Sequence, residues 1–366
     1  MNEKNSVVID CLSATGGGLN RISTSLANEL SKVSQVFVEA APEAGKFPAH
    51  VSVKSRQSAS RLLSLLMSLS IRWRYQLSPP AVTINVGPSL ILTPKCSLKY
   101  LLVHDLAFKA STHVNLTSRQ KLYRKIVTKQ ALKRADKIIS VSSSTKNELG
   151  VHYPRFLAKV QTFPLPIDQI FHDFQWRGGP WSRGEAMCSI FMFGHNTNKG
   201  VELVLQALSE TEWLRVTIAT SKKFWKDSGY SEKIHDLGIS ARVELLFDAS
   251  DEQLVDSLVQ HDVLAMPSTY EGFGLPVAEA LTLGVPTVIS NLEVLRETGS
   301  NFAVEMRSYT SVEFSQAVSR ALQMSSTHWQ DAREYFARRT WKWWIEDTGL
   351  FQVLEAQVKS IPEEVN

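Results

Sequence analysis

Two glutamates with seven residues between them form the pair of side chains best suited to chemistry in this sequence. Glu271 stands directly before Gly272, Phe273 and Gly274, and Glu279 follows in a helical pattern. A carboxylate can accept two hydrogen bonds from the neighbouring hydroxyls of a ribose, and the loop amides of Phe273 and Gly274 can donate to a sugar or phosphate oxygen. The spacing therefore indicates recognition of hydroxyl groups. The plainer alternative is a stabilising acid in the first turn of a helix beside a solvated loop acid.

The segments around this pair predict how it is positioned. Val263–Met266 is an apolar run typical of a buried strand, and Pro276 suits the first turn of a helix over Leu275–Leu283. Gly284 ends that helix, and Val285–Ser290 predicts the next strand. In such a strand-loop-helix unit, both carboxylates look toward the crevice outside the carboxyl end of the strand.

A second candidate site lies near the start of the chain. Val7–Cys11 predicts a strand, and a loop ending in Gly16, Gly17 and Gly18 leads into a helix from about Leu19 to Leu30. Free amides and the helix dipole together make such a loop an anion site. Because the glycines are contiguous, they do not match the G-x-G-x-x-G fingerprint of NAD oxidoreductases, and a plain tight turn is the alternative.

A third unit repeats this arrangement later in the chain. Ser189–Phe193 predicts a strand, a turn from Gly194 to Gly200 follows, and a helix is expected over Val201–Leu208. Lys199 in this turn can meet a diphosphate. The alternative is an exposed lysine at a helix start, which the helix dipole disfavours.

His104 follows the predicted strand Tyr100–Val103. A histidine at the point where a parallel strand meets its loop lies at the ligand crevice, so a ligand contact is favoured over a purely structural hydrogen bond.

Residues 267–291 read PSTYEGFGLPVAEALTLGVPTVISN, and this segment resembles the signature of retaining glycosyltransferases of family 4, the group 1 glycosyltransferases, with its EX7E motif. The acid, the glycine pair, the proline, the second acid and the trailing Gly-x-Pro all match together. The resemblance implies the α/β GT-B fold, in which two Rossmann-like domains face a central cleft, and a nucleotide-sugar donor. It is strongest over residues 243–291 and moderate over residues 99–198.

The resemblance also implies roles for the candidate residues. Glu271 and the amides after it would hold the donor sugar, Glu279 the ribose and Lys199 the diphosphate, while His104 would lie against the sugar. His195 stands where relatives carry an arginine, and a neutral imidazole offsets less phosphate charge than a guanidinium. The implied catalytic residues are His104, Lys199 and Glu271, and the implied donor-binding residues are Gly17, Gly18, His195, Lys199, Glu271, Gly272, Phe273, Gly274, Leu275 and Glu279.

The length of 366 residues predicts two domains. The resemblance implies an acceptor-side Rossmann-like domain over residues 1–172, a donor domain over 173–340, and a C-terminal helix over 341–366 that crosses back to the first domain. Cys11, Cys96 and Cys188 lack any metal-ligand spacing, which indicates a reduced cytosolic chain. The sequence has neither a signal peptide nor an apolar run that could cross a bilayer.

Charge is divided unevenly along the chain. Residues 1–170 contain 23 Lys and Arg against 9 Asp and Glu, a net +14, whereas residues 171–366 contain 17 against 27, a net −10. The basic half predicts a polyanion or an anionic surface as partner, and the acidic half argues against a nucleic-acid clamp that spans the whole protein. Ser118–Arg134 is a strongly basic helix, and Arg56–Tyr75 is an amphipathic segment that could lie on a membrane or pack on a sheet.

The resemblance implies transfer of a hexose, with GDP-mannose as the expected donor, to a hydroxyl of a growing bacterial surface glycan carried on a polyprenyl diphosphate, as in O-antigen and lipopolysaccharide synthesis. We expect a peripheral enzyme on the cytoplasmic face of the membrane with no cofactor and no nucleic-acid partner. No metal is expected, because neither half contains an Asp-x-Asp motif. A non-catalytic binder of nucleotide sugars or glycans and a GT-B sugar-nucleotide epimerase are the alternatives.

Overall fold

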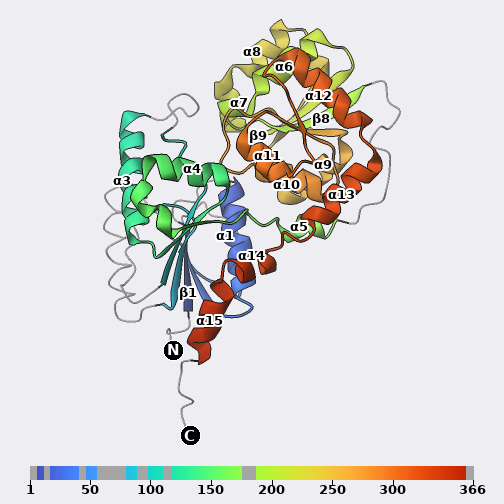
Figure 1. Cartoon of the computed structure of the whole chain (residues 1–366). Helices are drawn as coiled ribbons and strands as arrows, with labels where there is room; N and C mark the ends of the chain where they lie inside the picture. The colour runs from blue at the N-terminus through green and yellow to red at the C-terminus, as the bar shows by residue number, and fades with distance from the viewer. Residues whose placement is uncertain are drawn as a thin grey trace. The chain divides into compact units, whose positions relative to one another are not determined.

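The computed structural model of the chain describes residues 6–11, 17–40, 47–55, 80–88, 98–109, 117–174 and 187–359. These residues form two compact units (Figure 1). The first unit contains the described residues up to Asp168 together with those from Thr340 onward, and the second contains Gln169–Arg339.

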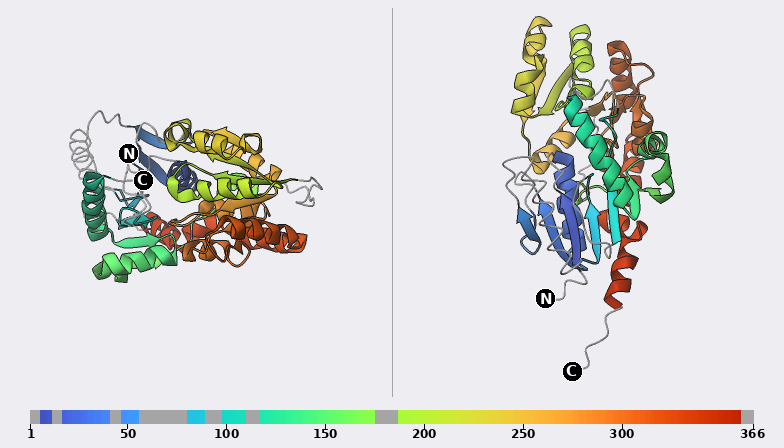
Figure 2. Two further views of the ribbon diagram at one scale, coloured as in Figure 1. Left: turned by 90° about the horizontal axis from the view of Figure 1, so that it is seen from above. Right: turned by 90° about the vertical axis from the view of Figure 1, so that its left-hand side faces the viewer.

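A parallel sheet forms the centre of the first unit, and Figure 2 shows its strands side by side. All six residues of the first strand are buried, as expected for a parallel sheet that is covered on both faces. The order is β3-β2-β1-β4-β5-β6-β7, with bounds β1 Ser6–Cys11, β2 Gln35–Ala40, β3 Ser52–Ser55, β4 Val82–Asn85, β5 Leu98–Val103, β6 Lys137–Ser140 and β7 Val160–Thr162.

Local capping signals explain where the helices of this unit begin. The Thr117 side chain accepts a hydrogen bond from the Gln120 amide at the start of α3 (Ser118–Arg134), and Gln120 reaches back to complete a capping box. Ser142 caps α4 (Ser143–His152), where its side chain accepts a hydrogen bond from the Thr145 amide. Helix α1 spans Gly17–Leu30, so it begins two residues before the predicted start.

The second unit has a six-stranded parallel sheet, β10-β9-β8-β11-β12-β13. Its strands are β8 Cys188–Phe193, β9 Leu214–Thr220, β10 Val243–Phe247, β11 Val263–Met266, β12 Thr287–Ile289 and β13 Val304–Glu305. Its helices are α5 Gln169–His172, α6 Val201–Glu210, α7 Lys222–Ser228, α8 Tyr230–Asp236, α9 Asp251–Gln260, α10 Leu275–Thr282, α11 Glu293–Gly299, α12 Ser311–Gln323 and α13 Ser326–Phe336.

Both sheets have the strand order of a doubly wound Rossmann fold. In each, the first strand lies between the second and the fourth, so the winding direction reverses between β1 and β4 and again between β8 and β11. Ligands of such sheets bind outside the carboxyl ends of the strands at this reversal, which is called the switch point.

The C-terminal segment differs from its prediction. The resemblance implies one long helix over residues 341–366, but the described residues of this segment form two, α14 (Trp341–Asp347) and α15 (Leu350–Lys359). Gly349 between them has a φ of +71°, which a right-handed helix cannot continue. Helix α14 packs against α1, so this segment belongs to the first unit.

Some sequence predictions lie outside the described residues: the amphipathic segment at residues 56–75, the loop at residues 13–16, Cys96, and most of the predicted linker, residues 175–185. Cys11 and Cys188 are both buried, and both have free thiols.

Candidate active site

The turn after β8 is shaped by two glycines. A Cβ on Gly194 would lie 2.5 Å from the Ile218 Cγ2 atom, so only glycine fits there. A short 3-10 turn, Thr197–Lys199, then leads to Gly200, whose φ of +75° lies in the left-handed region. A Cβ at Gly200 would also overlap the Pro267 carbonyl oxygen, so the turn after β8 lies directly against the end of β11.

The loop after β11 is held in a similar way. Gly274 caps α10 with a φ of +87°, and a Cβ there would lie 2.5 Å from the Leu295 Cδ2 atom. The Thr298 hydroxyl donates to the carbonyl of the buried Phe273. Leu275 is the first residue of α10, so its amide lies at the positive end of the helix.

Three hydrogen bonds join these two loops. The Thr269 amide donates to the Asn198 carbonyl at 2.8 Å, and the Asn198 side-chain amide donates to the Tyr270 carbonyl at 2.7 Å. The third is an ion pair, in which the Lys199 ammonium lies 2.6 Å from the Glu271 Oε1 atom. The structure therefore brings together two residues that the sequence analysis proposed separately.

The Lys199–Glu271 pair is shielded from water. The two side chains are only 9% and 11% exposed. The Ser268 hydroxyl also donates to Glu271 Oε1, at 2.7 Å. The arrangement offers a cation for phosphate oxygens beside a carboxylate for hydroxyl groups.

His195 lies in the same turn as Lys199, and its side chain is exposed. The pKa of the imidazole is lowered to about 4, mainly because the surrounding protein atoms displace water from the ring and also because of the nearby Lys199 ammonium, while Glu271 acts in the opposite direction. His195 is therefore neutral at neutral pH, which leaves Lys199 as the positive charge of this turn.

Glu279 lies on α10 and is almost completely buried, at 1% exposure. It is the fifth residue of the helix. Glu279 is not part of the hydrogen-bonded group formed by Lys199, Glu271 and Ser268. Gly272 lies in the loop between Glu271 and Phe273.

In the first unit, His104 follows β5 at the carboxyl edge of the sheet, as predicted, and is partly buried. Its Nε2 atom lies 2.6 Å from the Val86 carbonyl oxygen. Since a carbonyl only accepts, Nε2 carries the hydrogen of this bond. Burial lowers the His104 pKa below its usual value of 6.5. The hydrogen bond to Val86 and the charge of Asp105 act in the opposite direction but do not outweigh burial. In the resulting neutral ring, Nδ1 is an acceptor.

Gly17 and Gly18, which the sequence analysis placed in the loop before the first helix, lie instead in the first turn of α1. They follow β1, which borders the switch point of the first sheet. Of the glycine run, these two are the part that the structure describes.

The sequence analysis missed several residues that build this site. Asn198 and Ser268 were part of the segments it quoted, and their short polar side chains next to glycine or proline were the available signal. Tyr309 was missed as well, and its hydroxyl donates to the Pro267 carbonyl at 2.9 Å. No local signal identifies Tyr309, because its partner is 42 residues away in the sequence.

Residues 188–340 match the family described as glycosyl transferases group 1. The MMP alpha-(1->4)-mannosyltransferase of Mycolicibacterium hassiacum is 29% identical over 170 residues, which cover 46% of this chain and 40% of that relative. The O-antigen chain mannosyltransferase B of Escherichia coli is 23% identical over 230 residues, or 58% of each chain. The GDP-mannose:cellobiosyl-diphosphopolyprenol alpha-mannosyltransferase of Xanthomonas campestris is 25% identical over 124 residues, or 33% of each. The chain thus matches less than two thirds of the length of these relatives.

Solved structures match nearly the whole chain at low identity. Sucrose-phosphate synthase from Thermosynechococcus elongatus has a TM-score of 0.76 at 16% identity and covers 96% of this chain and 99% of its own. WaaG, a glycosyltransferase involved in lipopolysaccharide biosynthesis, has a TM-score of 0.73 at 15% identity, with 94% and 99% covered. Anabaena Alr3699/HepE in complex with UDP-glucose has a TM-score of 0.70 at 14% identity, with 97% and 100% covered. The chain therefore has the GT-B fold, and its residues 188–340 match the family model of group 1 glycosyl transferases.

Proposed function

We propose that the chain is a retaining hexosyltransferase that takes mannose from a nucleotide diphosphate sugar, GDP-mannose, and transfers it without a metal to a hydroxyl of a lipid-linked bacterial surface glycan. The contact between Lys199 and Glu271, at 2.6 Å, carries this proposal. It joins a cation suited to phosphate and an acid suited to sugar hydroxyls at the switch point of the second sheet.

Lys199 stabilises the leaving group. As the glycosidic bond of the donor breaks, negative charge grows on the diphosphate, and a buried ammonium interacts with that charge more strongly than an exposed one. The first turns of α6 and α10 add backbone amides at their positive ends, beside the two loops that carry Lys199 and Glu271. These fixed donors supply the charge stabilisation that the proposed mechanism needs.

Glu271 orients the donor sugar. Its Oε1 atom accepts from Lys199 and Ser268, which fixes the direction of the carboxylate. Its Oε2 atom can accept from sugar hydroxyls. Glu279, buried on α10, holds the ribose of the nucleotide in this proposal, as the family resemblance implies.

His104 contributes a neutral acceptor from the first unit. With its Nε2 hydrogen donated to the Val86 carbonyl, Nδ1 can accept a hydrogen bond from a hydroxyl group. A lowered pKa keeps this lone pair available at neutral pH. We assign this hydrogen bond to the donor sugar.

The choice of mannose and of a lipid carrier rests on relatives. Those from Mycolicibacterium hassiacum, Escherichia coli and Xanthomonas campestris are named as mannosyltransferases, and the name of the last includes both GDP-mannose and a diphosphopolyprenol acceptor. The fold neighbour HepE was solved with UDP-glucose, which supports a nucleotide-sugar donor in general.

We further propose that α3 docks on an anionic bilayer at the cytoplasmic face of the membrane. Leu122, Tyr123 and Ile126 on this helix are each more than half exposed. The helix has seven basic residues and no acidic one: Arg119, Lys121, Arg124, Lys125, Lys129, Lys133 and Arg134. Exposed apolar side chains among basic ones suit the boundary between lipid headgroups and acyl chains. In the described part of the chain, no helix is long and apolar enough to cross a bilayer.

The test is an assay of the full chain with GDP-mannose, UDP-glucose and other nucleotide sugars, each with a polyprenyl-diphosphate-linked glycan, followed by mass spectrometry. We expect transfer from GDP-mannose to give a product with the anomeric configuration of the donor. Isomerisation of the nucleotide sugar without transfer would identify an epimerase, and binding alone a non-catalytic binder. Excess EDTA should leave the rate unchanged, and a loss that a divalent ion restores would contradict metal independence.

A further inference from the structure

Tyr309 lies in the loop between β13 and α12, and its side chain reaches the end of β11. Its hydroxyl donates to the Pro267 carbonyl at 2.9 Å. The same hydroxyl would lie 2.9 Å from a Cβ built on Gly200, and that Cβ would overlap the Pro267 carbonyl oxygen. The Gly200 backbone therefore lies next to both the Tyr309 hydroxyl and the Pro267 carbonyl. Gly200 directly follows Lys199 in the sequence.

This contact completes the support of the Lys199 turn. On one side, Asn198 makes two hydrogen bonds to the loop after β11, to Thr269 and Tyr270. On the other side, the Gly200 backbone rests against the carbonyl that Tyr309 holds. Lys199 lies between these two supports, so the position of its backbone depends on both.

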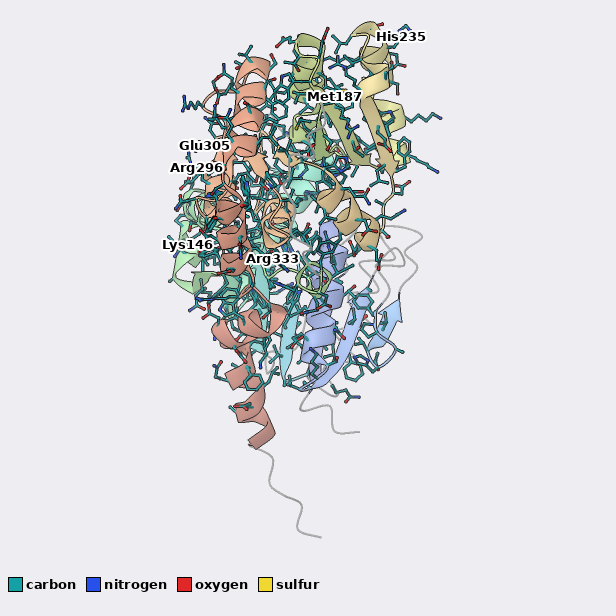
Figure 3. The ribbon with its side chains drawn as sticks, turned by 90° about the vertical axis from the view of Figure 1, so that its right-hand side faces the viewer. Lys146, Met187, His235, Arg296, Glu305 and Arg333 are labelled. Atoms are coloured by element: carbon teal, nitrogen blue, oxygen red, sulfur yellow. The ribbon has the colours of Figure 1, made fainter. Side chains whose placement is uncertain are left out.

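The loop that carries Tyr309 is itself anchored at both ends. Figure 3 shows Glu305 on β13 beside Arg296 on α11, and the two form an ion pair at 2.9 Å. After Tyr309, Thr310 caps α12, and the Glu313 carboxylate accepts from the Arg307 amide at 3.0 Å. A side chain from a loop fixed in this way can hold the Pro267 carbonyl in one place.

The ionisation of Tyr309 agrees with a donor role. Burial raises its pKa above the usual 10, and the negative charge of Glu202 and the neighbouring Tyr230 raise it further. The hydroxyl therefore keeps its hydrogen at neutral pH. The side chain is 43% exposed, so a phenylalanine can occupy this position without disrupting a packed core.

We propose that Tyr309 is a positioning residue for the transfer reaction: by holding the Pro267 carbonyl against Gly200, it sets the Lys199 ammonium where the leaving diphosphate develops its charge. The role of Lys199 in this inference rests on the proposed function. The position of the turn rests on the hydrogen bonds alone. Small displacements of a catalytic group reduce rates far more than they reduce ground-state binding.

The test compares Tyr309→Phe with the wild-type chain and with a matched control, Tyr335→Phe. Tyr335 is a similarly exposed tyrosine of the same unit, at 49%, and it lies on α13 with its ring against Phe302 and Phe336. We expect the two variants to have similar melting temperatures. Only Tyr309→Phe should speed amide hydrogen exchange at residues 197–201 and lower kcat about tenfold, with the KM for donor changed less than threefold.

A double-mutant cycle separates positioning from a general structural effect. In a Lys199→Ala background, Tyr309→Phe should cause no further loss of kcat, because the group that it positions is gone. Multiplicative losses in the double variant would overturn the proposal, and so would wild-type exchange rates at residues 197–201 in Tyr309→Phe. If the wild type transfers no sugar, the proposed function fails separately. In that case, hydrogen exchange and the same double-mutant cycle, measured as GDP and UDP affinity by calorimetry, decide whether Tyr309 acts through Lys199. If Tyr309→Phe changes neither the exchange rates nor the affinities, the positioning proposal is wrong.

Discussion

The two sheets share one strand order but differ in what lies at their switch points. In the first sheet, the buried Asp10 of β1 accepts from the Asn85 side chain of β4 at 2.7 Å, and a neutral His104 follows β5. In the second sheet, the loops after β8 and β11 are bonded to each other around a shielded ion pair between Lys199 and Glu271. The same topology thus presents a hydrogen-bonded carboxylate and a neutral histidine in one unit and a shielded ion pair in the other.

The difference shows that strand order provides the crevice, while the loops decide its chemistry. Burying the ion pair costs desolvation energy, and the fold does not need this pair in order to form. A buried charged pair in the loops at a switch point is therefore more typical of a functional site than of a structural one. The net charges of the two halves of the chain do not follow this difference. Lys199 lies in the acidic half, which has a net charge of −10, whereas the half that contains His104 has a net charge of +14.

The largest effect is expected from Lys199→Ala, which removes the cation from the second switch point. Turnover should fall about 100- to 1,000-fold, because the charge on the leaving diphosphate loses its main partner. Donor affinity should fall less, since that charge is greatest in the transition state. Steady-state kinetics with calorimetry would measure both, with Lys226→Ala on α7 as a surface control. Equal losses of turnover and affinity would mean that Lys199 only binds the donor.

The next largest effect concerns the first unit and its charge. Replacing Arg124, Lys125 and Lys129 on α3 with glutamine should weaken binding to anionic vesicles by about 3 kcal/mol, since each basic residue near such a surface contributes about 1 kcal/mol. Donor affinity should not change. Vesicle co-sedimentation at low and physiological salt is the measurement.

The matched control for this experiment is the corresponding triple substitution of three exposed lysines on α7 of the second unit: Lys222, Lys223 and Lys226. It should leave vesicle binding unchanged. A wild-type chain that ignores anionic vesicles at low salt would refute the docking proposal, whatever the variants do.

Glu279→Ala tests the assignment of the ribose to α10. Donor binding should weaken by about 1.5–3 kcal/mol, because charge-assisted hydrogen bonds to the ribose are lost. Calorimetry with the nucleotide sugar gives the value, and circular dichroism checks that the variant is folded. Unchanged affinity in a folded variant would remove Glu279 from the site.

The smallest effect is expected from His195→Arg. With a pKa of about 4, the wild-type imidazole is neutral from pH 6 to 8, so an arginine adds a charge that the turn lacks. Affinity for GDP should rise about threefold, as expected for a partly solvated charge, and by the same factor at pH 6 and pH 8. A wild-type affinity that rises between pH 8 and pH 6, in step with titration of His195, would show that the imidazole does become charged.

The sign of the associated stability change follows from the same pKa. The unfolded chain binds a proton at His195 near pH 6.5, and the folded chain only near pH 4. Stability from this group is therefore fully present above about pH 6.5 and decreases as the pH falls toward 4. Chemical denaturation of the wild type and of His195→Arg at several pH values would show the difference.

Local signals were enough to predict much of the second unit. Strand β11 has the bounds expected from sequence, and β8 and α10 each differ from theirs by one residue. Short-range features mark them: an apolar run closed by proline for β11, and Pro276 and Gly284 at the two ends of α10. Helix α12 was not predicted, although Thr310 and Glu313 have the spacing of a capping box.

The break at Gly349 shows a limit of family resemblance. The resemblance implies one long C-terminal helix, and the left-handed backbone at Gly349 divides it in two. The glycine was visible in the sequence, but its φ was not. Only packing of α14 against α1 decides which way the chain turns there.

The sequence by itself determined which residue types stand at the ends of β5, β8 and β11, since strands, glycine turns and helix starts are encoded within about ten residues of one another. Only the tertiary structure decided that β8 and β11 are neighbours, and hence that Lys199 and Glu271 form a pair across 72 residues of sequence. It also decided that Tyr309 supports that pair from a loop beyond β13. Such contacts depend on the order in which strands join a sheet, and many strand orders bury the same apolar residues equally well.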